Sequence, residues 1–223
     1  MARYDRLTVY NRMVSAGLIP LFYEADAGTA IKIADACASG GAPVLEFTNR
    51  GENALPVFIA LNDYIQKANL PIILGVGSVV DAPTAALFIA HGANFVVGPI
   101  FNAEIARLCN RRKIGYIPGC ATASEISNAE EAGAEIVKVH PASTLGGPAF
   151  VKAILAPMPW SKIMASGGVE PTRENIEAWI KAGAACVGMG GNLIRKEWVA
   201  LGNFAAVQDT VRSVVGWIKA LRP

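Results

Sequence analysis

A short phrase recurs four times along this chain: a glycine or a Gly-Ala pair, followed by a run of strand-forming residues. Each glycine follows an amphipathic stretch, such as 30–38 or 176–181, so we interpret it as a helix C-cap that leads into a strand. The copies begin at Gly41, Gly92, Gly133 and Gly183. Further strand-like runs lie between them at 18–23, 71–76, 114–118 and 161–165. The repeat therefore constrains the chain to alternating helices and strands.

Eight such strands between residues 18 and 190 predict a single (β/α)₈ TIM barrel with near-continuous apolar strands. A doubly wound open sheet is the alternative, but no Gly-x-Gly-x-x-Gly opens the first predicted helix. We expect residues 1–17 to form an extra N-terminal helix that closes the barrel bottom. We expect residues 192–223 to form the last helices against the outer wall. The chain of 223 residues shows no linker, so one domain over 1–223 is predicted.

Composition narrows the class of protein. Hydrophobic residues make up 52% and charged residues 17%, which excludes general disorder and suits a compact enzyme. The 20 basic and 18 acidic side chains are scattered, so no nucleic-acid partner is expected. The four cysteines lie far apart and form no CxxC pair, which indicates buried thiols in a reducing compartment.

Neither a signal peptide nor a membrane span is expected. The first residues lack the apolar core of a signal peptide. The segment 82–103 has no formally charged side chain, but prolines, glycines and His91 divide it into a helix, a turn and a strand. We therefore expect a soluble, cytoplasmic protein with no membrane partner.

Lys138 lies within the apolar run 136–141, which otherwise predicts a buried strand. A lone buried ammonium is costly, so such a lysine is either paired with an anion or held neutral. A neutral lysine attacks ketones and forms a Schiff base. The alternative is a structural ion pair with a carboxylate on a neighbouring strand.

Alternation along the strands places a carboxylate beside this amine. Glu46 and Thr48 share one face of their strand, as do Lys138 and His140, because side chains two apart project the same way. In such barrels the catalytic and binding residues lie at the C-terminal ends of the strands. We therefore predict that Glu46 and Lys138 point into one barrel mouth as general base and nucleophile. A purely structural Glu–Lys pair remains the alternative.

Glycine pairs follow the last two predicted strands: Gly167-Gly168 and Gly190-Gly191. Barrels commonly bind a phosphate at this corner through backbone N–H groups. Ser166 adds a hydroxyl. The pairs therefore predict a phosphate site, or else they only form tight turns.

Two further side chains are candidates with weaker support. Arg50 follows the second strand and suits a substrate carboxylate, although an arginine there is often only solvated. His140 suits acid–base chemistry or metal ligation. Because His91 belongs at the opposite end of the barrel, no metal site is expected.

With these residues the chain resembles a known family, the 2-keto-3-deoxy-6-phosphogluconate (KDPG) and 4-hydroxy-2-oxoglutarate (KHG) aldolases. These are class I pyruvate aldolases on a (β/α)₈ barrel. The resemblance runs from about residue 17 to 194. Segment 41–50 resembles the family's glutamate segment, which reads glycine, four residues, Glu, apolar, Thr, a variable residue, Arg. Segment 133–146 resembles its Schiff-base lysine segment.

By this resemblance Lys138 matches the imine-forming lysine, Glu46 the acid–base group, and Arg50 the arginine that holds the pyruvate carboxylate. We also expect Thr48, on the same face as Glu46, to border the substrate. The remaining matches lie at strand ends: Ser78 and Pro99 beside the substrate, Ser166, Gly167 and Gly168 at the first phosphate-binding turn, and Gly190 in the second.

The chain departs from the family pattern in the pocket. His140 stands where a Phe is usual, and Asn49 replaces an apolar residue. Gly191 falls where several members place a phosphate-binding Ser, and Ser78 and Ser166 replace the more usual Thr. These differences bear on the aldehyde half of the substrate and on phosphate binding.

The resemblance implies cleavage of KDPG to pyruvate and D-glyceraldehyde 3-phosphate, and of KHG to pyruvate and glyoxylate, without a cofactor. It also implies a homotrimer. The alternatives are a 2-keto-3-deoxy-6-phosphogalactonate aldolase and a TIM-barrel sugar-phosphate isomerase or epimerase in which Lys138 is only electrostatic. A barrel that binds phosphorylated ligands without catalysis is a further alternative.

Overall fold

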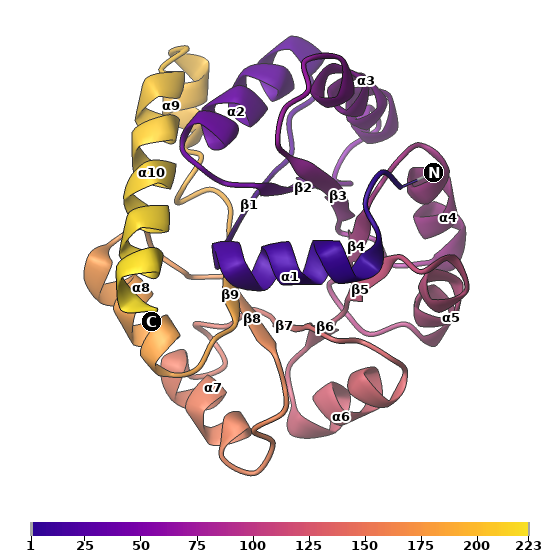
Figure 1. Ribbon diagram of the computed structural model, residues 1–223, viewed down its shortest axis with the longest axis vertical. Helices are drawn as coiled ribbons and strands as arrows, with labels where there is room; N and C mark the ends of the chain where they lie inside the picture. The colour runs from indigo at the N-terminus through magenta and orange to yellow at the C-terminus, as the bar shows by residue number, and fades with distance from the viewer. Residues whose placement is uncertain (1, 223) are drawn as a thin grey trace.

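The computed structural model describes residues 2–222 and shows a ring of parallel strands surrounded by helices (Figure 1). This is the predicted barrel, and its N-terminal helix is also confirmed. The strands are β1 (Leu18–Phe22), β2 (Val44–Thr48), β3 (Ile73–Gly77), β4 (Phe95–Val97), β5 (Gly115–Ile117), β6 (Gly119–Cys120), β7 (Val137–Val139), β8 (Ile163–Ser166) and β9 (Cys186–Met189).

Helices alternate with these strands on the outside of the ring. They are α1 (Arg6–Ala16), α2 (Ala27–Ser39), α3 (Ala54–Lys67), α4 (Ala82–Ala90), α5 (Ala103–Arg112), α6 (Ala123–Glu131), α7 (Pro148–Leu155), α8 (Arg173–Lys181), α9 (Lys196–Ala200) and α10 (Phe204–Leu221). Met1 and Pro223, the ends of the two predicted terminal segments, lie outside the described residues. None of the helices within 2–222 is both long and apolar enough to cross a membrane.

The fifth barrel position differs from the single strand expected at 114–118. It is divided into β5, which pairs with β4, and β6, which pairs with β7. Pro118 separates the two, because proline has no N–H to donate to a ladder. Its carbonyl still accepts from the Lys138 N–H at 2.8 Å, so the ring closes around the proline.

The repeated glycines follow helix ends, as predicted, but each lies one residue after the C-cap, which is Gly40, His91, Ala132 or Ala182. Gly41, Gly92, Gly133 and Gly183 have φ values of 92°, 99°, 90° and 98°, a region that favours glycine. Each follows its helix and turns the chain back toward the barrel. The repeat therefore sets where strands β2, β4, β7 and β9 begin.

Buried side chains form two cores. One lies between the strands and the outer helices, and the other fills the barrel interior. Helix α1 lies across the N-terminal end of the ring (Figure 1) and buries Val9, Tyr10 and Met13 in the interior core. On the outer wall α10 packs against α2 and α8, and it also contacts α1. Because α1 closes the N-terminal end of the interior core, the barrel interior opens toward the C-terminal ends of the strands.

Candidate active site

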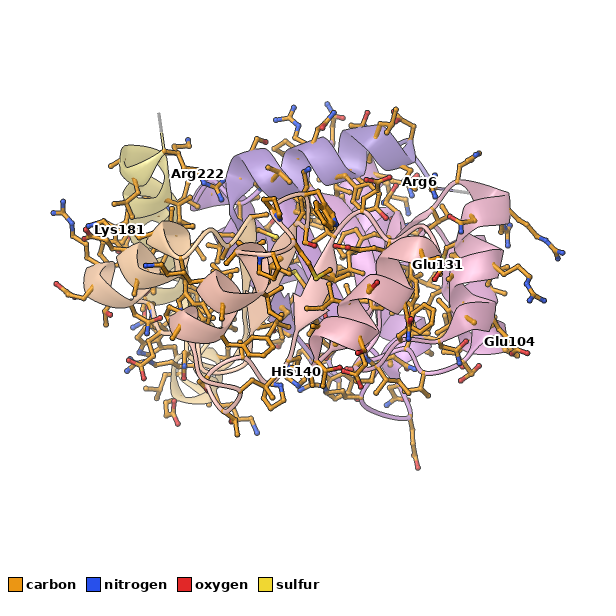
Figure 2. All side chains as sticks on the ribbon, turned by 90° about the horizontal axis from the view of Figure 1, so that it is seen from below. Arg6, Glu104, Glu131, His140, Lys181 and Arg222 are labelled. Carbon is orange, nitrogen blue, oxygen red and sulfur yellow. The ribbon has the colours of Figure 1, made fainter. Side chains whose placement is uncertain are left out.

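A pocket of about 270 Å³ lies at the C-terminal ends of the strands. His140, on its wall, lies on the face opposite α1 (Figure 2). The pocket brings together most of the predicted site residues: Arg50, Lys138, His140, Ser166, Gly167, Gly168, Gly190 and Gly191. Glu46 and Thr48 are buried in the barrel below the strand ends. Ser78 and Pro99 do not line this pocket.

Lys138 occupies the middle of β7, with 5% of its surface exposed. Its neighbours Val137 and Val139 are fully buried in the outer core, so the lysine projects inward as alternation requires. Within residues 2–222 the ion pairs are Lys181–Glu177 and Arg212–Asp209, and Lys138 takes part in neither. The structural ion-pair explanation for this lysine is therefore not supported.

Glu46, on β2, is 1% exposed, and its Oε2 has no hydrogen-bond partner among the described residues. Burial raises the pKa of this carboxyl, while the nearby charges of Lys138 and Arg50 act in the opposite direction. The buried hydroxyl of Thr48, two residues along the same face, is also unpartnered within 2–222. Two polar groups thus face the barrel mouth with unused hydrogen-bonding capacity, which is typical of a binding site rather than of a packed core.

Gly77 on β3 makes room for the glutamate, whereas Gly75 makes room for the Phe95 ring. Gly75 and Gly77 pair with Glu46 and Thr48 in the parallel ladder. A Cβ on Gly77 would overlap the Glu46 Oε1. The signal for this was present in the sequence, since two glycines two residues apart empty one face of a strand.

Arg50 follows β2 and is held by the end of β3. Its Nε donates a hydrogen bond of 3.0 Å to the Ser78 Oγ. Ser78 has a φ of 60°, a left-handed conformation that is uncommon for serine. Such conformations concentrate at functional sites. Ser78 therefore reaches the pocket through Arg50.

Pro99, at the end of β4, contributes to packing behind the lysine strand. Its carbonyl oxygen lies so close to Gly119 that any Cβ on that glycine would overlap it. Gly119 pairs with Lys138 in the ladder. The close approach of these backbones helps fix the position of β7.

His140 is half-buried on the pocket wall. Its Nδ1 lies 3.2 Å from the Ser166 carbonyl oxygen. Burial and the positive charges of Lys138 and Arg50 lower the pKa of the imidazole, against the opposite effect of that carbonyl. These effects favour the neutral form of the ring.

The segment after β8 has the features of an anion cradle. Ser166 is buried, and Gly167 and Gly168 have φ values of 90° and 81°. The backbone N–H groups of Gly167, Gly168, Gly191 and Asn192 have no backbone acceptor within 2–222. Free N–H groups that converge on a pocket bind phosphate oxygens.

Sequence reasoning missed several residues of this pocket. Leu21, Val169 and Met189 add apolar walls, and the Asn192 side chain donates to the Val169 carbonyl at 3.0 Å. These residues carry no motif of their own. Only their position at strand ends marks them. Within residues 2–222 no three His, Cys, Asp or Glu side chains gather as a metal site.

Comparison with known proteins places this chain in one family. The family model for KDPG and KHG aldolases matches residues 9–210. A 2-dehydro-3-deoxy-phosphogluconate aldolase of Pseudomonas aeruginosa is 33% identical over 96% of this chain and 92% of that protein. A 2-dehydro-3-deoxy-6-phosphogalactonate aldolase of Escherichia coli is 33% identical over 77% of this chain and 76% of that protein.

A solved structure gives the chemistry of a relative. The KDPG aldolase of Legionella pneumophila, with pyruvate captured as a covalent carbinolamine, superimposes with a TM-score of 0.83 at 25% identity. The match covers 92% of this chain and 97% of that one. The barrel, the family model and these relatives agree, and the chain belongs to the KDPG and KHG aldolase family of class I pyruvate aldolases.

Proposed function

We propose that this enzyme cleaves 2-keto-3-deoxy-6-phosphogluconate to pyruvate and D-glyceraldehyde 3-phosphate, with Lys138 as the nucleophile. The observation that carries the proposal is a buried lysine without an ion-pair partner within 2–222, whose amine borders the pocket near the buried Glu46. The name of the P. aeruginosa relative supports the choice of substrate.

In the first half of the reaction the Lys138 Nζ attacks the C2 ketone through its lone pair to form a carbinolamine. Transfer of a proton to the carbinolamine hydroxyl, which leaves as water, then gives a protonated imine. This cation accepts the electron pair of the C3–C4 bond when that bond breaks, so it supplies the electron sink that an aldol cleavage needs.

Glu46 is the proposed proton carrier. As a carboxylate it accepts the C4 hydroxyl proton while the C3–C4 bond breaks, which releases the aldehyde and leaves an enamine. It then returns a proton to C3, and water hydrolyses the imine to release pyruvate. Because burial raises its pKa, the carboxyl holds a proton more readily than an exposed glutamate does, as the second step requires.

Two anion sites position the substrate at its ends. Arg50 is placed to hold the keto-acid carboxylate, and the free N–H groups after β8 and β9 are placed to hold the phosphate. Thr48 and Ser166 add hydroxyls near the amine and the phosphate. Fixing both ends orients the bond that breaks.

Borohydride reduction in the presence of pyruvate tests the nucleophile. Peptide mapping should find a stable adduct on Lys138, and Lys138→Met should lose both the adduct and cleavage. The exposed Lys152 on α7 provides a matched control, because Lys152→Met should keep both. Cleavage without any adduct would contradict the imine route. An intact enzyme without adduct or C–C cleavage would favour a sugar-phosphate isomerase or epimerase.

The galactonate epimer is a second candidate substrate, because the E. coli relative at the same identity is named for it. KHG is a third, from the family itself. Pyruvate release measured with KDPG, its C4 epimer and KHG gives the kcat/KM ratios that assign the preference. The homotrimer implied by the family is also a proposal, and sedimentation velocity measures it.

A further inference from the structure

His140 lies between the lysine and the proposed phosphate cradle. It lies one residue beyond the end of β7, two residues after Lys138, and both residues line the pocket. Its ring also borders the cradle, because a Cβ on Gly167 would lie 3.1 Å from the His140 Nδ1. The imidazole therefore faces the middle of any substrate that extends from the amine to the cradle.

The surroundings of the ring fix which nitrogen carries the proton. The Ser166 carbonyl can only accept hydrogen bonds, so the neutral His140 must donate its Nδ1–H to it. That carbonyl is held in place by the Ala142 N–H, at 2.8 Å. The remaining nitrogen, Nε2, is then an acceptor, and it has no hydrogen-bond partner among residues 2–222.

Most polar groups on this wall donate hydrogen bonds, although the side chains of Ser166 and Asn192 also carry an oxygen that can accept. Of the ionisable side chains that line the pocket, Arg50 can only donate hydrogen bonds, and Lys138 is assigned to the C2 ketone. The backbone N–H groups of the cradle are donors as well. Donors suit the carboxylate and phosphate ends of the substrate, whereas a hydroxyl between them gains from a partner that accepts its proton. The Phe that is usual at this position offers no acceptor.

We propose that His140 is a specificity-determining residue whose Nε2 accepts a hydrogen bond from the substrate hydroxyl next to the phosphorylated carbon. This inference rests on the proposed function, which places C2 at Lys138, the C4 hydroxyl at Glu46 and the phosphate at Ser166–Gly168. C5 is the one hydroxyl-bearing carbon between C4 and the phosphorylated carbon, so its hydroxyl lies beside the imidazole.

A comparison of two substrates tests the contact. KDPG and its C4 epimer both carry a C5 hydroxyl, whereas KHG has a carboxylate at C5. His140→Phe removes both nitrogens and keeps a flat ring. It should lower kcat/KM about tenfold for the preferred phosphorylated substrate, the loss expected for one hydrogen bond, and leave kcat/KM for KHG unchanged. His140→Gln places an amide oxygen near the Nε2 position, so it should recover part of the lost activity.

Several results would overturn the assignment. An equal loss with both substrates would place His140 at the amine, and an unchanged kcat/KM with both would make it structural only. His140→Gln no better than His140→Phe, with both folded by circular dichroism, would remove the acceptor role. So would a wild-type enzyme that cleaves KHG but neither phosphorylated epimer. Borohydride trapping of pyruvate separates the two proposals: an adduct in wild type and in His140→Phe keeps the imine mechanism whatever His140 does, whereas its absence in wild type defeats the proposed function itself.

Discussion

Gly77 on β3 lies against the Glu46 carboxylate so closely that no larger residue fits there without moving it. The two residues are on adjacent strands, since Glu46 pairs with Gly75 and Thr48 with Gly77. The glutamate thus lies in a slot made by missing side chains. Its position, and not only its identity, is determined by the neighbouring strand.

Gly77→Ala should therefore displace Glu46 and lower kcat at least about 100-fold, because small misplacements of a reacting group are costly. Overpacking should also lower the free energy of unfolding by about 1–3 kcal/mol. Gly216 on α10 has no atom near a built Cβ, so Gly216→Ala is the control and should keep full activity. Steady-state kinetics and thermal melts measure both. Full activity in Gly77→Ala would show that the barrel mouth is more pliable than its packing indicates.

Glu46→Gln should lower kcat and raise stability at neutral pH. The pKa of the folded carboxyl lies above its ordinary value of 4.5, because the group is buried. As the pH rises above 4.5, the unfolded chain releases this proton while the folded chain retains it, so stability is lost until the pH passes the folded pKa.

Glutamine cannot ionise and escapes that loss. We expect Glu46→Gln to be more stable than wild type by about 1 kcal/mol at pH 7, with little difference at pH 4. The activity should fall by about 100-fold or more. Denaturant melts at pH 7 and pH 4 measure the difference in free energy of unfolding between Glu46→Gln and wild type. A variant that is less stable than wild type at pH 7 would mean that the carboxylate is well stabilised when ionised.

Ser78 should act on the substrate through Arg50. The hydroxyl accepts from the Arg50 Nε, so Ser78→Ala frees an exposed guanidinium and should raise KM for the keto acid about threefold. Arg50→Ala, which removes a charge-assisted contact, should lower kcat/KM about 30-fold.

A double-mutant cycle separates the two roles. In the Arg50→Ala background, Ser78→Ala should have almost no further effect on KM. If Ser78→Ala is equally harmful in both backgrounds, the serine contacts the substrate itself.

The barrel could be predicted because its signals are local and repeated. The glycines at 41, 92, 133 and 183 each require a positive φ, and the chain turns at every one of them. The division of the fifth strand was not predicted. Pro118 was included in a strand because its neighbours are apolar, yet its missing N–H interrupts the ladder.

The site was predictable in its residues but not in its contacts. Alternation alone indicates that Glu46 and Lys138 face one mouth, because both strands end at the same edge. Alternation cannot show that Ser78 holds Arg50 or that Ser166 orients His140. Those contacts depend on loop geometry and not on the two-residue period of a strand. Leu21 and Met189 lie near strand ends but carry no motif, so the sequence alone does not assign them to the pocket.

Removal of divalent metals should leave activity unchanged. The proposed electron sink is an imine on Lys138, which needs no Lewis acid. Turnover measured after dialysis against EDTA should match the untreated enzyme. Complete loss, restored by a divalent cation, would favour a metal-dependent aldolase reaction in which His140 or Glu46 is a ligand.

We expect Gly168 to affect binding of the substrate phosphate and not binding of the keto-acid end. Its φ of 81° disfavours any side chain, and a Cβ there would overlap the Ser143 hydroxyl. Gly168→Ala should therefore distort the cradle and raise KM about tenfold for a phosphorylated substrate, with KM for KHG unchanged. The loss corresponds to one or two weakened N–H contacts with the phosphate.

Gly202 supplies the matched control for this change. It has a φ of 68° with no neighbour near a built Cβ, so Gly202→Ala carries a similar backbone cost of about 1 kcal/mol away from the pocket. Both variants should melt earlier than wild type, but only Gly168→Ala should change KM. An equal rise in KM for KHG would mean that the turn after β8 supports the whole pocket, since a phosphate site alone would leave the unphosphorylated substrate unaffected.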